Sequence, residues 1–199
     1  MRLAVLLSGR GSNFTAIHEA IVRGDLPASI VAVISNRPAA HGIDKARQWG
    51  YAVHVLDHRQ FSSRDTHEDA IRALLDAVRP DFLALAGYMR LLSPRFVGSW
   101  LNRIVNIHPS LLPAFPGVDA QAQALAHGVK VSGCTVHFVD EGLDAGPIIV
   151  QRSVPVLDGD SVESLSTRIL EQEHVAYVEA LQLLASGSYT IDGRRVIRA

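Results

Sequence analysis

The nine residues Val105–Pro113, VNIHPSLLP, mark the place where the pattern of the chain changes. Before this stretch, short apolar runs alternate with amphipathic segments. After it, two apolar runs follow each other with only a short loop between them. Strands that alternate with helices predict right-handed βαβ units and a parallel sheet, whereas a short loop favours antiparallel neighbours. We therefore expect one α/β domain: a Rossmann-like, mostly parallel sheet flanked by helices, with antiparallel strands in its C-terminal part.

The expected elements follow from the spacing of apolar residues and from the positions of glycine, proline and capping residues. Short apolar runs predict strands over 2–8, 29–36, 51–56, 81–87, 103–108, 131–140 and 146–156. Helical spacing predicts helices over 13–24, 41–50, 64–80, 93–100 and 160–187. We expect Asp160 or Ser161 to cap the last helix and Gly187 to end it. The segment 188–199 is predicted to form a small hairpin around Asp192-Gly193.

The composition is that of an ordinary globular protein and narrows the function classes. Of 199 residues, 48% are hydrophobic and 20% are charged, and the net charge is -1. This balance gives no electrostatic reason to expect nucleic acid or an anionic membrane as a partner. The single cysteine, Cys134, excludes an internal disulfide and a multi-cysteine metal site. No apolar run approaches the roughly 20 residues that span a bilayer. We expect a cytoplasmic protein. We also expect no metal site.

Asn106 and His108 lie two residues apart at the end of an expected strand. Their side chains therefore leave the same face of the strand. The carboxyl ends of strands in α/β sheets border the crevice where ligands bind. An amide can donate to a developing oxyanion, and an imidazole can donate as well or carry a proton. The pair therefore suits nucleophilic attack on a carbonyl; the alternative is a hydrogen-bonded polar pair that only closes the strand end.

The loop Ser8–Asn13, SGRGSN, joins the first strand to the first helix. Backbone N–H groups and the helix N-terminus make such a loop a phosphate-binding candidate. The dinucleotide fingerprint fits poorly, because Phe14 replaces its third small residue and Ser35-Asn36-Arg37 offers no acidic residue after the second strand. A single phosphate group fits better. The alternative is a tight turn with Ser12 or Asn13 as the N-cap of the helix.

The loop Asp140–Gly146, DEGLDAG, joins the two expected antiparallel strands. A carboxylate from this loop placed beside His108 would favour the protonated imidazole and fix its ring. The alternative is a set of solvated loop carboxylates. The sequence has no G-x-S-x-G nucleophile elbow. Direct transfer between two bound substrates is therefore the simpler chemistry.

Four motifs together resemble the phosphoribosylglycinamide formyltransferases, which are folate-dependent enzymes of purine biosynthesis. The motifs are SGRGSN at 8–13, AGYMRLL at 86–92, NIHPSLLP at 106–113 and DEGLDAGP at 140–147. The resemblance extends from residue 1 to about residue 185. It implies the formyltransferase fold, with a phosphate-binding half over about 1–100 and a folate-binding and catalytic half over about 101–187. It also implies formyl transfer from 10-formyltetrahydrofolate, as co-substrate, to the amine of glycinamide ribonucleotide.

The resemblance implies roles for individual residues of this chain. The catalytic residues would be Asn106, His108 and Asp144. The nucleotide substrate would be held at its phosphate by Gly11, Ser12 and Asn13 and contacted elsewhere by Glu173. The folate-binding site would be lined by Arg64, Met89, Arg90, Leu91, Leu92, Asn106 and Asp140, and the 140–144 loop would surround the pterin. The partners implied are these two small molecules, and the chain would be a monomer or a homodimer.

Alternative functions and two departures from the family pattern accompany this interpretation. A 10-formyltetrahydrofolate hydrolase would have an additional N-terminal domain, and a methionyl-tRNA formyltransferase would have a C-terminal RNA-binding domain. We expect neither domain, and therefore neither of these two functions. A phosphorylated-ligand-binding module without turnover and an NADP-dependent reductase that uses Arg37 are further alternatives. Many relatives have histidine at position 119 or 121, where this chain has Asp119 and Gln121, and Leu170 replaces a residue that is often polar.

Overall fold

The computed structural model describes residues 1–199, which form two compact units, Met1–Val105 and Asn106–Ala199. The strand β5 (Ile104–His108) passes from the first unit into the second. The predicted α/β class is confirmed, with parallel strands in the N-terminal part and antiparallel strands in the C-terminal part. None of the helices is long and apolar enough to cross a membrane.

The first unit is built on parallel strands. These are β1 (Arg2–Leu7), β2 (Ser29–Ser35), β3 (Val53–Val55) and β4 (Phe82–Leu85), in the order β3-β2-β1-β4. Strand β1 is central and buried on both faces, as its uninterrupted apolar run predicts. The chain reverses its direction of winding between β1 and β4. Ligands of open α/β sheets bind beyond the carboxyl ends of the strands at such a reversal.

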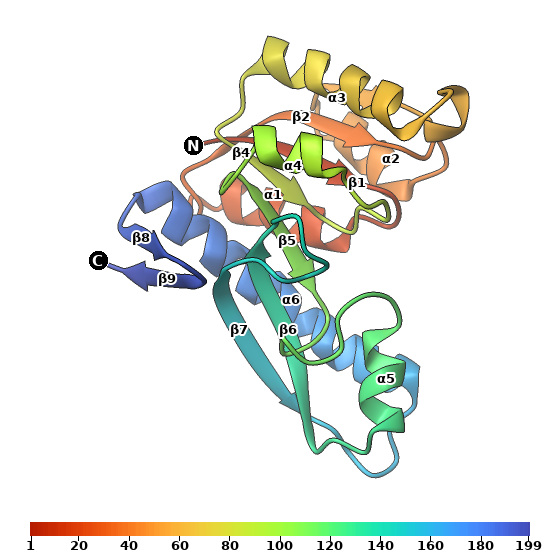
Figure 1. Cartoon of the computed structure of the whole chain (residues 1–199), viewed down its shortest axis with the longest axis vertical. Coiled ribbons are helices and arrows are strands. Elements are labelled where there is room, and N and C mark those ends of the chain that lie inside the picture. Colours follow the sequence, from red (N-terminus) through yellow and green to blue (C-terminus); the bar gives the residue numbers. More distant parts are fainter. The chain divides into compact units, whose positions relative to one another are not determined.

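Helices cover both faces of these strands. They are α1 (Ser12–Val22), α2 (His41–Gln48), α3 (Arg64–Val78), α4 (Pro94–Ser99) and the short 3-10 helix η1 (His58–Gln60). Figure 1 shows α1 and α3 on opposite sides of the strands. Right-handed crossovers require this arrangement, because the connection from β3 to β4 runs opposite to the earlier ones.

The alternative interpretation of this loop assigned the N-cap of α1 to Ser12 or Asn13, and neither residue is the cap. The N-cap is Gly11, whose φ of 70° lies in the left-handed region, and no side chain caps the helix. Glycine is required here for a second reason. A Cβ on Gly11 would lie 3.0 Å from the Cα of Gly42, because the two backbones pack against each other. The turn therefore leaves the Ser12 side chain outside the cap.

The second unit contains an antiparallel pair backed by a long helix. Strand β6 (Val131–Phe138) pairs with β7 (Ile148–Pro155), and α6 (Val162–Ser186) packs on both. Ser161 caps α6 by accepting from the Ser164 N–H, and Gly187 ends it with a φ of 67°. Asp160 is not the cap, because its carboxylate binds Arg168 instead.

One helix of this unit was not expected from the sequence. Helix α5 (Ala120–Ala126) has the sequence AQAQALA and begins after Asp119, which has a φ of 56°. Alanine, glutamine and leucine are strong helix formers. The family departures at positions 119–121 therefore lie at the start of a regular helix.

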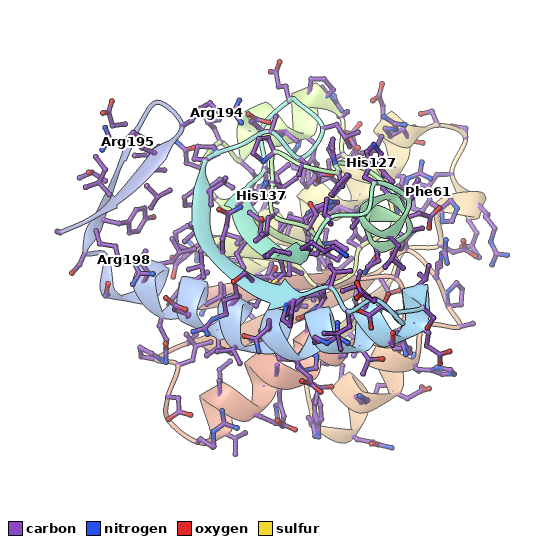
Figure 2. The ribbon with its side chains drawn as sticks, turned by 90° about the horizontal axis from the view of Figure 1, so that it is seen from below. Phe61, His127, His137, Arg194, Arg195 and Arg198 are labelled. Atoms are coloured by element: carbon purple, nitrogen blue, oxygen red, sulfur yellow. The ribbon has the colours of Figure 1, made fainter.

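The C-terminal hairpin is confirmed. Strands β8 (Tyr189–Asp192) and β9 (Arg195–Arg198) pair in antiparallel fashion, with Gly193 in the left-handed region at the turn. Figure 2 shows Arg194, Arg195 and Arg198 on this hairpin. Glu179 of α6 accepts from Arg198 at 2.8 Å and from Arg152 of β7 at 2.9 Å. One carboxylate therefore joins the helix to both β7 and the hairpin.

Replacing Glu179 with glutamine is expected to lower the free energy of unfolding near neutral pH by about 1 kcal/mol, a small value because the pairs are partly solvated. The bond from Arg198 in the first place, and Arg152 in addition, lower the pKa of Glu179 in the folded state. The stabilisation is therefore present above the unfolded-state pKa and is lost as the pH falls through the folded-state pKa. Urea unfolding of both proteins at pH 7 and at pH 3 measures this difference.

The matched control is Glu171→Gln, which removes an exposed carboxylate from the same helix. We expect that control to change the unfolding free energy by less than about 0.5 kcal/mol. A Glu179→Gln difference that persists at the lower pH would contradict the assignment to these ion pairs.

Candidate active site

Strand β5 brings Asn106 and His108 to one face, as their spacing predicts. His108 is buried, with 5% of its surface exposed. Its Nε2 lies 2.9 Å from the Phe115 carbonyl oxygen, and its Nδ1 lies 3.4 Å from Asp144 Oδ2. Carbonyl and carboxylate oxygens only accept hydrogen bonds. Both ring nitrogens of His108 therefore face hydrogen-bond acceptors.

Asp144 has an unusual backbone conformation. Its φ is 50°, in the left-handed region that non-glycine residues rarely adopt. The Gly117 N–H donates to Oδ2 at 2.8 Å, so this oxygen receives the loop N–H and also faces the imidazole. Such conformations persist only where surrounding contacts hold them, and they cluster at functional sites. The structure thus brings Asp144 and His108 together.

Close backbone packing shapes the loop that carries Asp144. A Cβ on Gly146 would lie 2.0 Å from the Phe138 carbonyl oxygen, which leaves no room for any other residue. Asp140 accepts from the Gly142 N–H at 3.0 Å. These contacts fix the start and the end of the 140–146 loop.

Substituting alanine for Gly146 is expected to lower the free energy of unfolding by roughly 1–3 kcal/mol, because the backbone must shift to admit the methyl group. Thermal unfolding followed by circular dichroism measures the effect. Gly159→Ala is the matched control, since nothing lies within 4 Å of a Cβ there. Equal melting temperatures for the two variants would refute the tight packing at Gly146.

His137 belongs to the same cluster, and the sequence interpretation did not include it. It is buried on β6, with Nε2 3.3 Å from Asn106 Nδ2 and 3.7 Å from Asp144 Oδ1. Burial lowers the pKa of His137, with His108 adding to the effect, while the bond to the Phe138 carbonyl and the charges of Asp144 and Asp140 oppose it.

The tautomer of His137 follows from its contacts. Nδ1 lies 2.8 Å from the Phe138 carbonyl oxygen, so Nδ1 carries the proton and donates it there. Nε2 is then an acceptor for one N–H of the Asn106 amide. Its place near the end of an apolar strand, just before the acidic loop, was the signal available in the sequence. A lone histidine in such a run is otherwise interpreted as part of the core.

The segment between β5 and α5 lies against this cluster. Phe115, Gly117 and Asp119 all have φ in the left-handed region. Nearer to β5, the Thr135 hydroxyl donates to the Ser110 carbonyl oxygen at 2.7 Å and accepts from the Leu112 N–H at 3.0 Å. The start of the segment is thus fixed to β6. Its middle contacts His108 and Asp144 through backbone atoms.

The remaining predicted residues of the second unit lie on two elements. Asp140 is in the acidic loop described above. Glu173 lies on α6 and is 8% exposed. Burial raises the pKa of Cys134 to about 12, and the charge of Glu173 adds to this effect. Cys134 is therefore an inert, buried thiol of β6.

The predicted phosphate and folate residues of the first unit lie at the carboxyl ends of its strands. Gly11, Ser12 and Asn13 form the turn into α1. Arg64 is exposed in the first turn of α3. In the stretch 89–92, Met89 is 70% and Leu91 63% exposed, whereas Arg90 and Leu92 are partly buried. The Met89 N–H donates to Ser8 Oγ at 2.8 Å, so this stretch lies against the glycine loop.

The chain is similar in sequence to known proteins. The chain is 42% identical over 187 residues to phosphoribosylglycinamide formyltransferase of Escherichia coli, covering 94% of this chain and 88% of that protein. It is 48% identical over 193 residues to trifunctional purine biosynthetic protein adenosine-3 of Drosophila melanogaster, with 96% of this chain covered. The chain spans only 14% of that much longer relative.

The fold is also similar to that of a solved structure. The crystal structure of glycinamide ribonucleotide transformylase 1 from Symbiobacterium toebii superimposes with a TM-score of 0.97 at 49% identity, covering 100% of this chain and 93% of that one. The family model described as formyl transferase matches residues 1–181. The chain therefore belongs to the formyl transferase family.

Proposed function

We propose that this chain transfers the formyl group of 10-formyltetrahydrofolate to the amine of glycinamide ribonucleotide, which yields formylglycinamide ribonucleotide and tetrahydrofolate. The observation that carries the proposal is the arrangement of His108 between Asp144 and a carbonyl acceptor, in a cluster with Asn106. Relatives whose names include this activity match nearly the whole chain, which supports it.

The reaction begins when the free amine attacks the formyl carbon. The carbonyl becomes an oxyanion in a tetrahedral intermediate, and positioned N–H donors lower the energy of that charge. In our proposal, Asn106 Nδ2 and protonated His108 donate to the oxyanion, and Asp144 stabilises the imidazolium. The proton of the attacking amine then passes to the departing folate nitrogen, directly or through water, as the bond from the formyl carbon to that nitrogen breaks.

His137 orients the amide of Asn106 in this mechanism. With its Nδ1 proton held by the Phe138 carbonyl, His137 Nε2 accepts one of the two Asn106 N–H groups. The second N–H group is then available to the oxyanion. His137 thereby acts as a positioning residue and does not transfer a proton.

The carbonyl oxygen of Phe115 stands in for the substrate oxygen in this structure. It accepts from His108 Nε2, the donor that the mechanism assigns to the oxyanion. The segment around Phe115 must therefore move away from His108 when substrate binds.

The two substrates would be held by the residues predicted from the sequence. The turn Gly11, Ser12 and Asn13 would bind the phosphate of the nucleotide, because it places backbone N–H groups at a helix N-terminus. Glu173 would contact the same substrate. The folate-binding site would be lined by Arg64, Met89, Arg90, Leu91, Leu92, Asn106 and Asp140. The proposal requires no metal, and it assigns the reaction to the cytoplasm with the protein as a monomer or a homodimer.

The test follows the folate absorbance of purified protein with 10-formyltetrahydrofolate, with and without glycinamide ribonucleotide. Turnover that requires the nucleotide is the expected result. Equal turnover without the nucleotide would favour hydrolysis of the formyl group by water. Absence of turnover in folded protein that still binds the nucleotide would refute the proposal and favour a binding module.

A further inference from the structure

Glu68 is a buried carboxylate that the proposed mechanism does not use. It lies on α3 and is 1% exposed. Its Oε1 accepts from the backbone N–H of Ser93 at 2.8 Å, and its Oε2 accepts from the Ser93 hydroxyl. A buried carboxylate is costly unless it is hydrogen-bonded, and bonds to a charged acceptor are stronger than neutral ones. Glu68 is therefore a firm anchor for the chain at Ser93.

The chain anchored in this way is the stretch 88–93, which we call the folate strap. Its other end is also held, because the Met89 N–H donates to Ser8 Oγ, and the Ser8 hydroxyl donates to Asn36 Oδ1 at 2.5 Å. Between the two anchors, the side chains of Met89 and Leu91 are largely exposed. A loop keeps such apolar side chains in one place only when its backbone is fixed by a rigid support.

The inner side of the folate strap depends on few polar contacts of its own. Tyr88 Oη and Arg90 Nε are buried without hydrogen-bond partners. Burial raises the pKa of Tyr88; the charge of Arg90 opposes the rise and that of Glu68 adds to it. The two bonds from Ser93 to the buried carboxylate of Glu68 fix the strap at that end.

Glu68 also connects the strap to Arg64. The two residues are four positions apart on α3 and therefore lie on the same side of the helix. Ser93 caps α4 in addition, by accepting from the Phe96 N–H at 3.2 Å. The bonds between Glu68 and Ser93 therefore join the starts of two helices and the strap between them.

We propose that Glu68 is a positioning residue for the folate co-substrate, acting through Ser93 to hold the folate strap in a fixed relation to Arg64. The inference rests on the proposed function, because that function makes Arg64 and 89–92 the lining of the folate site. Glu68 itself does not contact substrate. Without its bonds to Ser93, binding of the folate has to order the strap, which weakens affinity for the folate alone.

The test is the full chain with Glu68→Gln, which keeps the size of the side chain and removes its charge. The KM for 10-formyltetrahydrofolate is expected to rise about tenfold, while kcat and the KM for glycinamide ribonucleotide stay within about twofold. Tetrahydrofolate, measured by quenching of intrinsic fluorescence, is expected to bind about tenfold more weakly. Asp69→Asn is the matched control: it alters the next residue, an exposed carboxylate that pairs with Arg95 of α4, and is expected to change neither constant.

Ser93→Ala provides a second variant, because it removes the hydroxyl donor and leaves Glu68 in place. It is expected to raise the KM for the folate in the same selective way, and it decides the question if Glu68→Gln does not fold. An unchanged folate KM in a folded variant, or equal increases for both substrates, would overturn the role of Glu68. Absence of turnover and of folate binding in the unaltered protein would instead overturn the proposed function itself.

Discussion

His108→Ala is expected to reduce kcat by at least about 10²–10³, the usual cost of removing one oxyanion donor. In the proposed mechanism, His108 supplies the charged donor and Asn106 the neutral one, and His137 orients the latter. Asn106→Ala is therefore expected to cause a loss of similar size. Steady-state kinetics at saturating concentrations of both substrates measure each loss.

A matched control separates catalysis from folding in these variants. His54→Ala replaces a histidine on β3, outside the cluster, and is expected to leave kcat within about twofold of the unaltered protein. Circular dichroism and thermal unfolding establish that each variant is folded. Near-normal turnover of folded His108→Ala would remove this residue from the mechanism.

Asp144→Asn is expected to lower kcat by about 10²-fold at neutral pH. Asp144 Oδ2 lies 3.4 Å from His108 Nδ1, so the substitution removes the negative charge that faces the proposed charged donor. Steady-state kinetics with both substrates saturating measure the loss.

Asp158→Asn is the control for this experiment. Asp158 is an exposed carboxylate of the same unit that pairs with Lys130 at 2.9 Å. It is expected to leave kcat within about twofold of the unaltered protein. A similarly small change in folded Asp144→Asn would mean that Asp144 does not support His108 in the reaction.

Much of the fold could be predicted because its signals are local. Apolar runs such as 2–8 identify buried strands, and Ser161 and Gly187 identify the ends of α6. Helix α5 was missed because its apolar positions are mostly alanines, which carry little hydrophobic periodicity. The alternative N-caps of α1, Ser12 and Asn13, are not used, because Gly11 adopts a left-handed conformation that allows the turn without a side-chain cap.

The site was only partly predictable for a different reason. Asn106 and His108 could be predicted from their spacing on one strand, and the acidic loop suggested a carboxylate partner for His108. His137 acquires its place only through contacts with residues distant in sequence, Asn106 and Asp144. Phe115 contacts His108 through its carbonyl oxygen, and Gly117 contacts Asp144 through its N–H. Every residue except proline has both of these backbone groups. No side-chain pattern can reveal such contributions.

The most direct test of the central claim follows the formyl carbon itself. Protein is incubated with glycinamide ribonucleotide and 10-formyltetrahydrofolate that carries carbon-13 in the formyl group, and the label is followed by nuclear magnetic resonance. We expect the label to appear as an amide formyl group on the nucleotide with the unaltered protein, and far more slowly with His108→Ala. Label that appears as free formate, or that reaches the nucleotide equally fast with His108→Ala, would contradict formyl transfer at the Asn106–His108–Asp144 cluster.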